Sequence, residues 1–251
     1  MILDRIVRYA EERAAGLPDM SGQESEYRPV SLRDSISAVK DRNAVIAEIK
    51  FSSPSRGRIR VNSPVEGIAM SLAGGGCTAI SVLTEPRFFG GNTDYIRRVR
   101  SVTSLPILRK DFIVDERQIY ETRMLGADAV LLIAGLLGER LADFVTLSLD
   151  TGLEPLVEVR TSKEADLALE SGAELIGINN RDLRTMRINL QTTELLSGRV
   201  HDAGRVVVSE SGISSPADLR RLKQFSDAYL IGSAIMAEKD PGRKVETFVC
   251  V

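Results

Sequence analysis

Eight short apolar runs, rich in β-branched residues, recur along the chain with starts roughly 20 to 30 residues apart. They cover residues 45–50, 77–83, 105–109, 129–133, 155–159, 175–179, 206–210 and 228–231. Segments of helical composition separate the runs, and several of these segments end in glycine-containing steps that are typical of helix C-caps. One strand, one helix and two short loops fill each interval, so the pattern predicts parallel strands joined by crossover helices.

Two architectures satisfy this alternation, an open doubly wound sheet and a closed (β/α)8 barrel. In the open sheet the first strand commonly leads into a glycine-rich G-x-G-x-x-G turn, whereas residues 51–55 read Phe-Ser-Ser-Pro-Ser. A length of 251 residues suits one barrel. We therefore predict an α/β fold, a (β/α)8 TIM barrel that forms a single domain over residues 1–251, with residues 1–44 as an N-terminal helical extension.

The N-terminal extension has the pattern of helices. Ile2, Ile6 and Val7 recur with helical spacing until Gly16 breaks the pattern, and Ser31 marks the start of a second helix. Because no strand signal precedes the first run, we expect the extension to form a lid or rim over the mouth of the barrel.

Composition limits the possible partners. The chain has 33 Lys and Arg residues against 35 Asp and Glu, a net charge of −2, and no basic patch stands out. This argues against nucleic acid or an anionic membrane as the main partner. The longest apolar run, 129–137, is far shorter than the roughly 20 residues that cross a bilayer, and charged residues interrupt residues 4–13, where an export signal needs an apolar core. We expect a cytoplasmic monomer or weak homo-oligomer that binds a small molecule.

The metal-binding residue types are scarce. Only Cys77 and Cys250 are present, too few for a disulfide framework, and both fit a reducing compartment. His201 is the one histidine, so a zinc or iron site is not expected, while the scattered carboxylates leave a magnesium site open as an alternative. Its position between a helix and the seventh expected strand places it away from the chemistry, and Cys77 is expected in the core.

Charged and amide side chains stand at the carboxyl ends of five expected strands. These residues are Glu48, Lys50, Lys110, Glu158, Asn179 and Glu210. Strand side chains alternate between the barrel interior and the surrounding helices, and the alternation places these six on the interior side. Solvated strand ends or structural ion pairs are the alternative for any single residue. Five strands that share the feature favour a catalytic cluster, because barrel enzymes keep their catalytic residues at this end.

Two glycine turns follow the seventh and eighth expected strands. Gly212 comes after Ser211, and Gly232 is followed by Ser233 at the start of a short helix. Glycine lets backbone N–H groups approach an anion closely, and barrels commonly bind phosphate at these two strands. Each glycine alone could serve a tight turn. Together with Ser233 they predict a phosphate site at Gly212 and Gly232.

Six motifs, in order on separate strands, resemble those of the indole-3-glycerol-phosphate synthase family. They are Ala-Glu-Ile-Lys at 47–50 with Ser-Pro-Ser at 53–55, Leu-Arg-Lys-Asp-Phe-Ile at 108–113, Leu-Val-Glu-Val at 156–159, Gly-Ile-Asn-Asn-Arg-Asp-Leu at 177–183, Ser-Glu-Ser-Gly-Ile at 209–213 and Leu-Ile-Gly-Ser at 230–233. The resemblance covers essentially the whole chain. One departure is Phe51, which stands where many relatives carry a basic residue that would contact the phosphate or the rim.

The resemblance implies that 1-(2-carboxyphenylamino)-1-deoxyribulose 5-phosphate closes to indole-3-glycerol phosphate, losing carbon dioxide and water. The ring carbon that bears the carboxylate attacks the ketone, so an acid must protonate the developing alkoxide, and Lys110 is the candidate. The resulting iminium is itself an electron sink for decarboxylation, so no cofactor and no metal is expected. A hydroxyl then leaves as water while Glu158 acts as the base. Lys50 holds the substrate carboxylate and is a second candidate acid.

The resemblance also implies roles for neighbouring residues. Glu48 orients Lys50 through an ion pair, and Asn179 and Glu210 bind the sugar hydroxyls or the leaving oxygen. Arg181 braces its loop or the substrate anion. The remaining substrate-binding candidates are the ring wall of Pro54, Phe89, Phe112, Leu131 and Leu183, with Ser53 and Ser211 beside it.

Other functions compete with this one. A related isomerase, phosphoribosylanthranilate isomerase, would need Cys and Asp at the strand ends instead of Lys and Glu. A Schiff-base aldolase acting on a sugar phosphate would use a desolvated lysine as its nucleophile. A non-catalytic phosphate-binding barrel would bind the product without turnover. A covalent adduct trapped by borohydride on Lys110 or Lys50 distinguishes the aldolase from the other two.

Overall fold

The computed structural model describes residues 2–23, 25–61 and 63–251. Its eight barrel strands are β1 (Ala44–Ile49), β4 (Ala79–Leu83), β5 (Ile107–Lys110), β6 (Ala129–Ile133), β7 (Glu154–Val159), β8 (Leu175–Asn179), β9 (Val206–Glu210) and β10 (Ala228–Ile231). They close in the order β1-β10-β9-β8-β7-β6-β5-β4, and every neighbouring pair is parallel. The predicted TIM barrel is confirmed.

The strand positions agree with the apolar runs to within two residues. The largest offsets are at β4 and β5, which begin two residues after the starts of the runs at 77–83 and 105–109. At β5 the reason is Pro106, which has no backbone N–H to donate to a strand ladder. Its carbonyl still accepts a hydrogen bond from the N–H of Ile80, at 2.9 Å.

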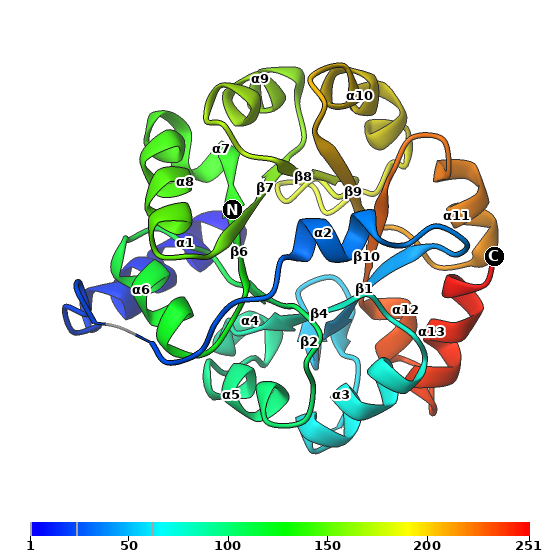
Figure 1. Cartoon of the computed structure of the whole chain (residues 1–251), viewed down its shortest axis with the longest axis horizontal. Coiled ribbons are helices and arrows are strands. Elements are labelled where there is room, and N and C mark those ends of the chain that lie inside the picture. The colour runs from blue at the N-terminus through cyan, green and yellow to red at the C-terminus, as the bar shows by residue number, and fades with distance from the viewer. Residues whose placement is uncertain (1, 24, 62) are drawn as a thin grey trace.

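Most of the helices form a ring around the barrel, whereas α2 lies across one end of it (Figure 1). The helices of the described residues are α1 (Ile2–Ala15), α2 (Leu32–Ser37), α3 (Val65–Gly74), α4 (Pro86–Phe89), α5 (Asp94–Arg100), α6 (Arg117–Met124), α7 (Ala134–Leu137), η1 (Gly138–Arg140), α8 (Leu141–Asp150), α9 (Ser162–Glu170), α10 (Gln191–Asp202), α11 (Pro216–Leu222), α12 (Ser233–Met236) and α13 (Pro241–Val249). A two-stranded hairpin of β2 (Ser52–Ser53) and β3 (Gly57–Arg58) follows β1. Helix α11 begins with a capping box, in which Ser215 is the N-cap and Pro216 the first helical residue.

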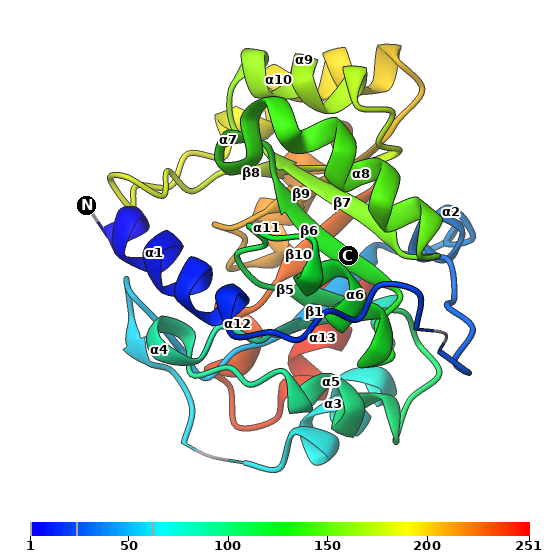
Figure 2. The same ribbon diagram turned by 90° about the vertical axis from the view of Figure 1, so that its left-hand side faces the viewer.

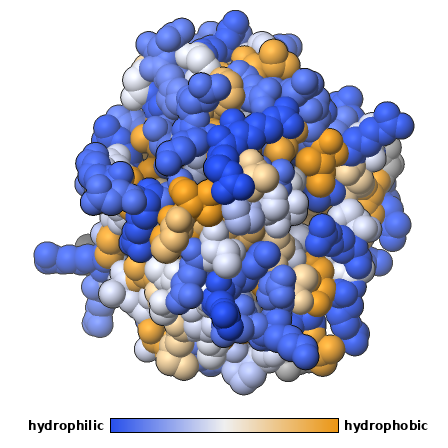
Figure 3. Space-filling model, turned by 90° about the vertical axis from the view of Figure 1, so that its right-hand side faces the viewer, coloured by the Kyte–Doolittle hydropathy of each residue, from blue (hydrophilic) through white to orange (hydrophobic). Residues whose placement is uncertain are grey.

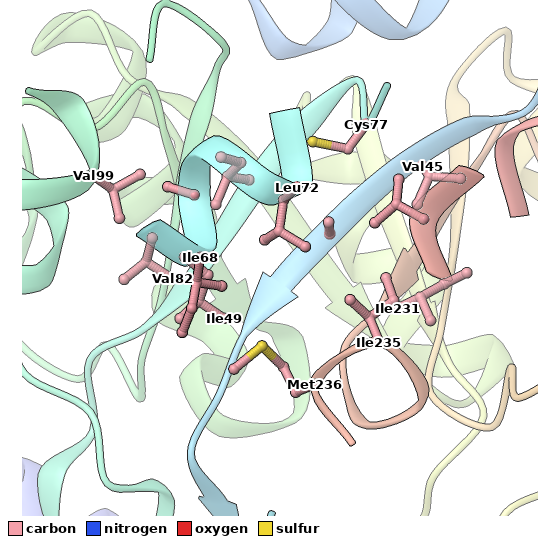
Figure 4. Packing of buried hydrophobic residues seen from close by; sticks show 14 of the residues in the cluster. Val45, Ile49, Ile68, Leu72, Cys77, Val82, Val99, Ile231, Ile235 and Met236 are labelled. Atoms are coloured by element: carbon pink, nitrogen blue, oxygen red, sulfur yellow. The ribbon is translucent and has the colours of Figure 1, made fainter. Parts of the chain in front are cut away.

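The strands bury apolar side chains on both faces. One cluster joins Val45, Ile49 and Ile231 to Leu72 of α3 and Ile235 of α12, outside the barrel (Figure 4). Cys77 belongs to this cluster, as expected. A second cluster fills the barrel interior, and its members include Ala44, Ile46, Ala79, Leu108, Ala129, Leu131, Leu156, Leu175, Val208, Ala228 and Leu230. The chain therefore carries near-continuous apolar strands, as expected for a parallel sheet covered on both faces.

The N-terminal extension divides between the two ends of the barrel (Figure 2). Helix α1 buries Ile6, Ala10 and Ala14 against Phe112 and Val114, which follow the carboxyl end of β5. The expectation that the extension covers the mouth is therefore wrong for α2, which lies at the opposite end.

Helix α2 closes the amino end of the barrel. Its Leu32 and Ile36, one turn apart, pack in the interior cluster with Ala44 and Ala79, the first residues of β1 and β4. The Ser31 hydroxyl donates a hydrogen bond to Glu154, the first residue of β7, at 2.6 Å. The small side chains at these strand starts leave room that two larger apolar side chains fill.

The outer surface is mostly hydrophilic. On the face shown in Figure 3, apolar residues occur in small separate groups. Among the residues that the structure describes, the large apolar side chains that are exposed are Val30, Val61, Met70, Leu149, Ile188 and Leu195, which lie on different segments. Across residues 2–23, 25–61 and 63–251, no helix is both long and apolar enough to cross a membrane.

Candidate active site

A cavity of about 290 Å³ opens at the carboxyl ends of the strands. It is lined by nearly all of the site residues expected from the sequence: Glu48, Lys50, Ser53, Pro54, Phe89, Lys110, Phe112, Leu131, Glu158, Asn179, Arg181, Leu183, Ser211, Gly212, Gly232 and Ser233. Glu210 is the one expected residue outside this lining. It is fully buried, and its carboxylate contacts Lys110 from within the barrel.

Lys110 stands among three carboxylates contributed by three other strands. Its Nζ lies 2.5 Å from Glu210 Oε2, 3.8 Å from Glu48 Oε2 and 3.9 Å from Glu158 Oε2. Burial by itself lowers the pKa of Lys110, but the charges of Glu210, Glu48 and Glu158 outweigh it and raise the pKa above its usual value. Lys110 is therefore a protonated donor at neutral pH.

At Glu158 the effect of burial on the pKa is not outweighed by the neighbouring positive charge. Burial and the neighbouring charge of Glu210 raise its pKa to about 7, against the lowering effects of Lys110 and of a hydrogen bond from Asn179. That bond runs from Asn179 Nδ2 to Glu158 Oε1 at 2.9 Å and fixes the orientation of the carboxylate. A carboxyl group with a pKa near neutrality is suited to exchange protons in both directions.

Glu48 and Lys50 form a second pair on β1 and the residue after it. Lys50 Nζ lies 2.5 Å from Glu48 Oε1, with both side chains mostly buried. Burial raises the pKa of Glu48, yet the charges of Lys50 and Lys110 outweigh this and lower it below its usual value. Glu48 therefore stays ionised and links the two ammonium groups.

Two glycines make room for these carboxylates. A Cβ at Gly232 would overlap Glu48 Oε1, and a Cβ at Gly177 would overlap Glu210 Oε1. Gly232 thus has a steric role besides the one expected toward phosphate. Gly177 was missed as a functional residue, although its place on the interior face of β8, two residues before Asn179, is visible in the sequence.

The turn after β9 lines the cavity with Ser211 and Gly212. Ser211 has φ 65° and Gly212 has φ 86°, so both lie in the left-handed region. A Cβ at Gly212 would overlap the side chain of Ile188, another residue of the cavity wall. Helix α12, which starts at Ser233 after Gly232, spans only four residues. Any anion here would therefore be held by individual N–H groups more than by a helix dipole.

Aromatic residues form one wall of the cavity. The rings of Phe89 and Phe112 lie with centroids 6.1 Å apart, and helix α1 packs behind them. Phe51 faces the other way, buried in the outer cluster with its ring edge-on to Tyr95 at 5.7 Å. Because this side chain points into the core, it contributes nothing to the cavity.

Two arginines line the cavity, Arg181 from the loop after β8 and Arg56 from the β2–β3 hairpin. Burial lowers the pKa of Arg181, and the charge of Arg56 lowers it further. Arg181 also donates to the carbonyl of Met186 at 3.2 Å. Arg56 lines the cavity from the β2–β3 hairpin. It was missed from the sequence, where the only signal is a basic residue directly after the Ser-Pro-Ser motif.

The one histidine lies away from the cavity. His201 is on α10, with Nε2 3.1 Å from Asp227 Oδ2, and Asp227 precedes the amino end of β10. Among the residues that the structure describes, no group of three or more His, Cys, Asp or Glu side chains could hold a metal ion.

Known proteins resemble the chain over its whole length. The family model described as indole-3-glycerol phosphate synthase matches residues 4–248. An indole-3-glycerol phosphate synthase of Thermoanaerobacter sp. (strain X514) is 43% identical over 99% of this chain and 97% of that protein. One from Bordetella pertussis (strain Tohama I) is 42% identical over 99% of this chain and 98% of its own.

Solved structures show the same barrel at low sequence identity. KGPDC from Streptococcus mutans superposes with a TM-score of 0.63 at 15% identity, over 82% of this chain and 95% of that chain. Thiamine phosphate pyrophosphorylase from Pyrococcus furiosus gives a TM-score of 0.62 at 19% identity, over 87% of this chain and 96% of that chain. At such identities these two similarities concern the fold alone.

Proposed function

The chain belongs to the indole-3-glycerol phosphate synthase family, and we propose that Lys110 and Glu158 are the acid and the base of its reaction. The enzyme is a decarboxylating carbon–carbon lyase of tryptophan biosynthesis. It closes the ring of 1-(2-carboxyphenylamino)-1-deoxyribulose 5-phosphate and releases carbon dioxide and water to give indole-3-glycerol phosphate. The observation that carries the assignment of roles is the contact of one protonated lysine with three carboxylates, one of which has a pKa near 7.

Ring closure needs an acid at the ketone oxygen. As the ring carbon attacks the ketone, negative charge develops on that oxygen, and Lys110 Nζ donates a proton to it. The ring nitrogen becomes an iminium that accepts the electron pair of the breaking carbon–carboxylate bond. Carbon dioxide leaves, the six-membered ring regains its aromaticity, and no cofactor takes part.

Dehydration needs both a base and an acid. Glu158 takes a proton from the ring CH2 beside the new tertiary alcohol, and the hydroxyl leaves as water once it is protonated. Lys50, paired with Glu48, holds the substrate carboxylate before its loss and is the second acid. Asn179 orients Glu158, and Glu210 holds Lys110 and the sugar hydroxyls.

The two ends of the substrate have separate binding sites in this proposal. The aryl ring lies between Phe89 and Phe112 on one side and Pro54, Leu131 and Leu183 on the other. Ser53 and Ser211 contact the linking sugar, and Arg181 contacts an anionic group. The phosphate accepts hydrogen bonds from the N–H groups of Gly212 and Gly232 and from Ser233.

The cellular setting is part of the same proposal. We place the enzyme in the cytoplasm, as one domain over residues 1–251 whose N-terminal extension ends before β1 begins at Ala44, and as a monomer or weak homo-oligomer that binds no nucleic acid. The near balance of charges and the two unpaired cysteines, Cys77 and Cys250, support this setting.

The Schiff-base alternative has a physical argument against it. A nucleophilic lysine must be neutral, which requires a lowered pKa, whereas the carboxylates around Lys110 raise its pKa. The test is to incubate the purified chain with the carboxyphenylamino ribulose phosphate and follow indole fluorescence, with and without borohydride. Turnover without a trapped adduct supports the proposal. An adduct on Lys110 or Lys50 would favour the aldolase, and bound product without turnover would favour the non-catalytic barrel.

A further inference from the structure

Asn180 is a buried amide directly after β8 that the proposed reaction does not use. Its side chain has no exposed surface, and the same holds for Thr193 on α10 and Ser209 on β9. A buried amide whose donors and acceptor are all engaged rigidifies the segments that it joins. Here those segments are the loop that carries Arg181 and Leu183 and the turn that carries Ser211 and Gly212.

The hydrogen bonds of Asn180 reach three segments. Its Nδ2 lies 3.1 Å from Ser209 Oγ, 3.1 Å from the carbonyl of Glu210 and 3.2 Å from the carbonyl of Ser211. Its Oδ1 accepts from Thr193 Oγ1 at 2.9 Å and from the Thr193 N–H at 3.2 Å. The hydroxyls of Thr193 and Ser209 are themselves 2.9 Å apart.

The backbone of Asn180 completes the connection. Its N–H donates to the Glu210 carbonyl at 2.9 Å, and its own carbonyl accepts from the Asn189 N–H at 2.9 Å. Residues 181–188 are therefore a loop closed at its base by Asn180. Both the side chain and the backbone of this one residue hold the peptide units that follow Glu210.

The Ser211–Gly212 peptide is the unit that this arrangement orients. In a trans peptide the C=O and N–H groups point in opposite directions. Because Asn180 holds the Ser211 carbonyl, the Gly212 N–H points away from Asn180, and Gly212 itself lines the cavity. Ser211 reaches this orientation at φ 65°, a left-handed conformation that costs a residue other than glycine about 1 kcal/mol or more. Hydrogen bonds from Asn180 offset that cost.

We propose that Asn180 is a positioning residue that sets the affinity of the cavity for a phosphate group by orienting the Ser211–Gly212 peptide. The inference rests on the proposed function in one respect, the location of the phosphate at Gly212. Asn180 itself contacts no substrate. Its replacement therefore weakens phosphate binding more than it changes the chemistry around Lys110.

Asn180→Asp is the sharpest variant because it preserves shape and removes the donors. The aspartate still accepts from Thr193 but repels the carbonyls of Glu210 and Ser211. We expect the Kd for inorganic phosphate, measured by calorimetry, and the KM for the substrate to rise by about tenfold to a hundredfold, the usual cost of misplacing a binding group. The change in kcat should be smaller than the change in KM.

The pH dependence separates positioning from general loss of structure. Burial raises the pKa of an aspartate, and its protonated form regains one donor. The ratio of the variant Kd to the wild-type Kd for phosphate should therefore fall as the pH is lowered, while the ionisation of phosphate itself cancels in the ratio. A ratio that stays constant across pH, in a folded variant, would contradict the proposal.

Two further variants keep the test decisive. Asn92→Asp makes the same charge change on an exposed residue outside the cavity lining, whose Oδ1 accepts from the Asp94 N–H, and it should leave the Kd unchanged. Thr193→Val removes one of the two donors to Asn180 and should raise the Kd by a few fold, which serves if Asn180→Asp fails to fold. An unchanged phosphate Kd in folded Asn180→Asp, or in Thr193→Val where the first variant does not fold, overturns the inference. Wild-type protein that binds phosphate but forms no indole would instead overturn the proposed function.

Discussion

Lys110 Nζ lies 2.5 Å from Glu210 Oε2, while the second oxygen of the same carboxylate, Oε1, has no hydrogen-bond partner among the described residues. The two residues are 100 positions apart in the sequence and meet only because the sheet closes. A buried carboxylate oxygen without a partner costs about 1 to 3 kcal/mol, so this position of Glu210 is held at a cost to stability. This relationship places one acid and one open acceptor side by side beneath the cavity.

Gly177→Ala and Gly232→Ala should damage the two carboxylates differently. The new Cβ at residue 177 displaces Glu210, and we expect kcat to fall at least about tenfold with little change in the Kd for phosphate. The new Cβ at residue 232 displaces Glu48 and also narrows the phosphate site, so kcat should fall and KM should rise together. Steady-state kinetics with calorimetry of inorganic phosphate would separate the two, and equal effects on phosphate binding would contradict the assignment.

Leu32→Ala should destabilise the protein without changing its chemistry. Leu32 is fully buried at the amino end of the barrel, and removing such a side chain costs about 2 to 5 kcal/mol of unfolding free energy. Urea unfolding should show this loss, with kcat and KM within about twofold of wild type. Leu195→Ala is the matched control, because Leu195 is 79% exposed and should cost almost nothing. A large fall in kcat in folded Leu32→Ala would mean that α2 acts on the mouth after all.

Glu158→Gln should stabilise the protein at alkaline pH. Since the folded pKa of Glu158 is raised to about 7 from an ordinary value of 4.5, the folded state binds more protons than the unfolded state between these values. Stability therefore falls as the pH rises through this window, and the full cost is present above pH 7. The variant avoids this cost, so its Tm should exceed that of wild type at pH 8 by more than at pH 4. A Tm difference that is constant with pH would show that the pKa of Glu158 is not raised.

The strand positions and the interior charges could be predicted from the sequence for the same physical reason. Alternation fixes which side chains of a strand face inward, so Glu48, Glu158 and Asn179 could be placed in one cluster without coordinates. The close contact between Lys110 and Glu210 could not be predicted, because the distance between them depends on the stagger of the strands in the closed barrel. Strand periodicity also carries no sign of where a preceding helix packs, and α2 was therefore expected at the wrong end.

Local backbone geometry limited the remaining predictions. The role of Asn180 depends on the left-handed φ of Ser211, a conformation that a serine does not signal. The sequence shows that Phe51 stands where many relatives carry a basic residue. Only its packing against Tyr95 shows that its side chain points away from the cavity. The need for glycine at Gly177 is visible only in the structure, where a Cβ would overlap Glu210 Oε1.

The pH dependence of kcat tests the acid and base assignment most directly. With Glu158 as base, kcat should fall as the pH drops below about 7, because the carboxylate with that pKa becomes protonated. The alkaline limb should lie above the ordinary lysine range, because the surrounding carboxylates raise the pKa of Lys110, and both limbs belong to the interacting group of charges.

Glu158→Gln and Lys110→Met should each lower kcat by about 10² to 10⁴, and Glu158→Gln should flatten the acidic limb. His201→Asn should leave the wild-type profile unchanged. Near-normal kcat in both Lys110→Met and Glu158→Gln, or loss of the profile in His201→Asn, would contradict the mechanism.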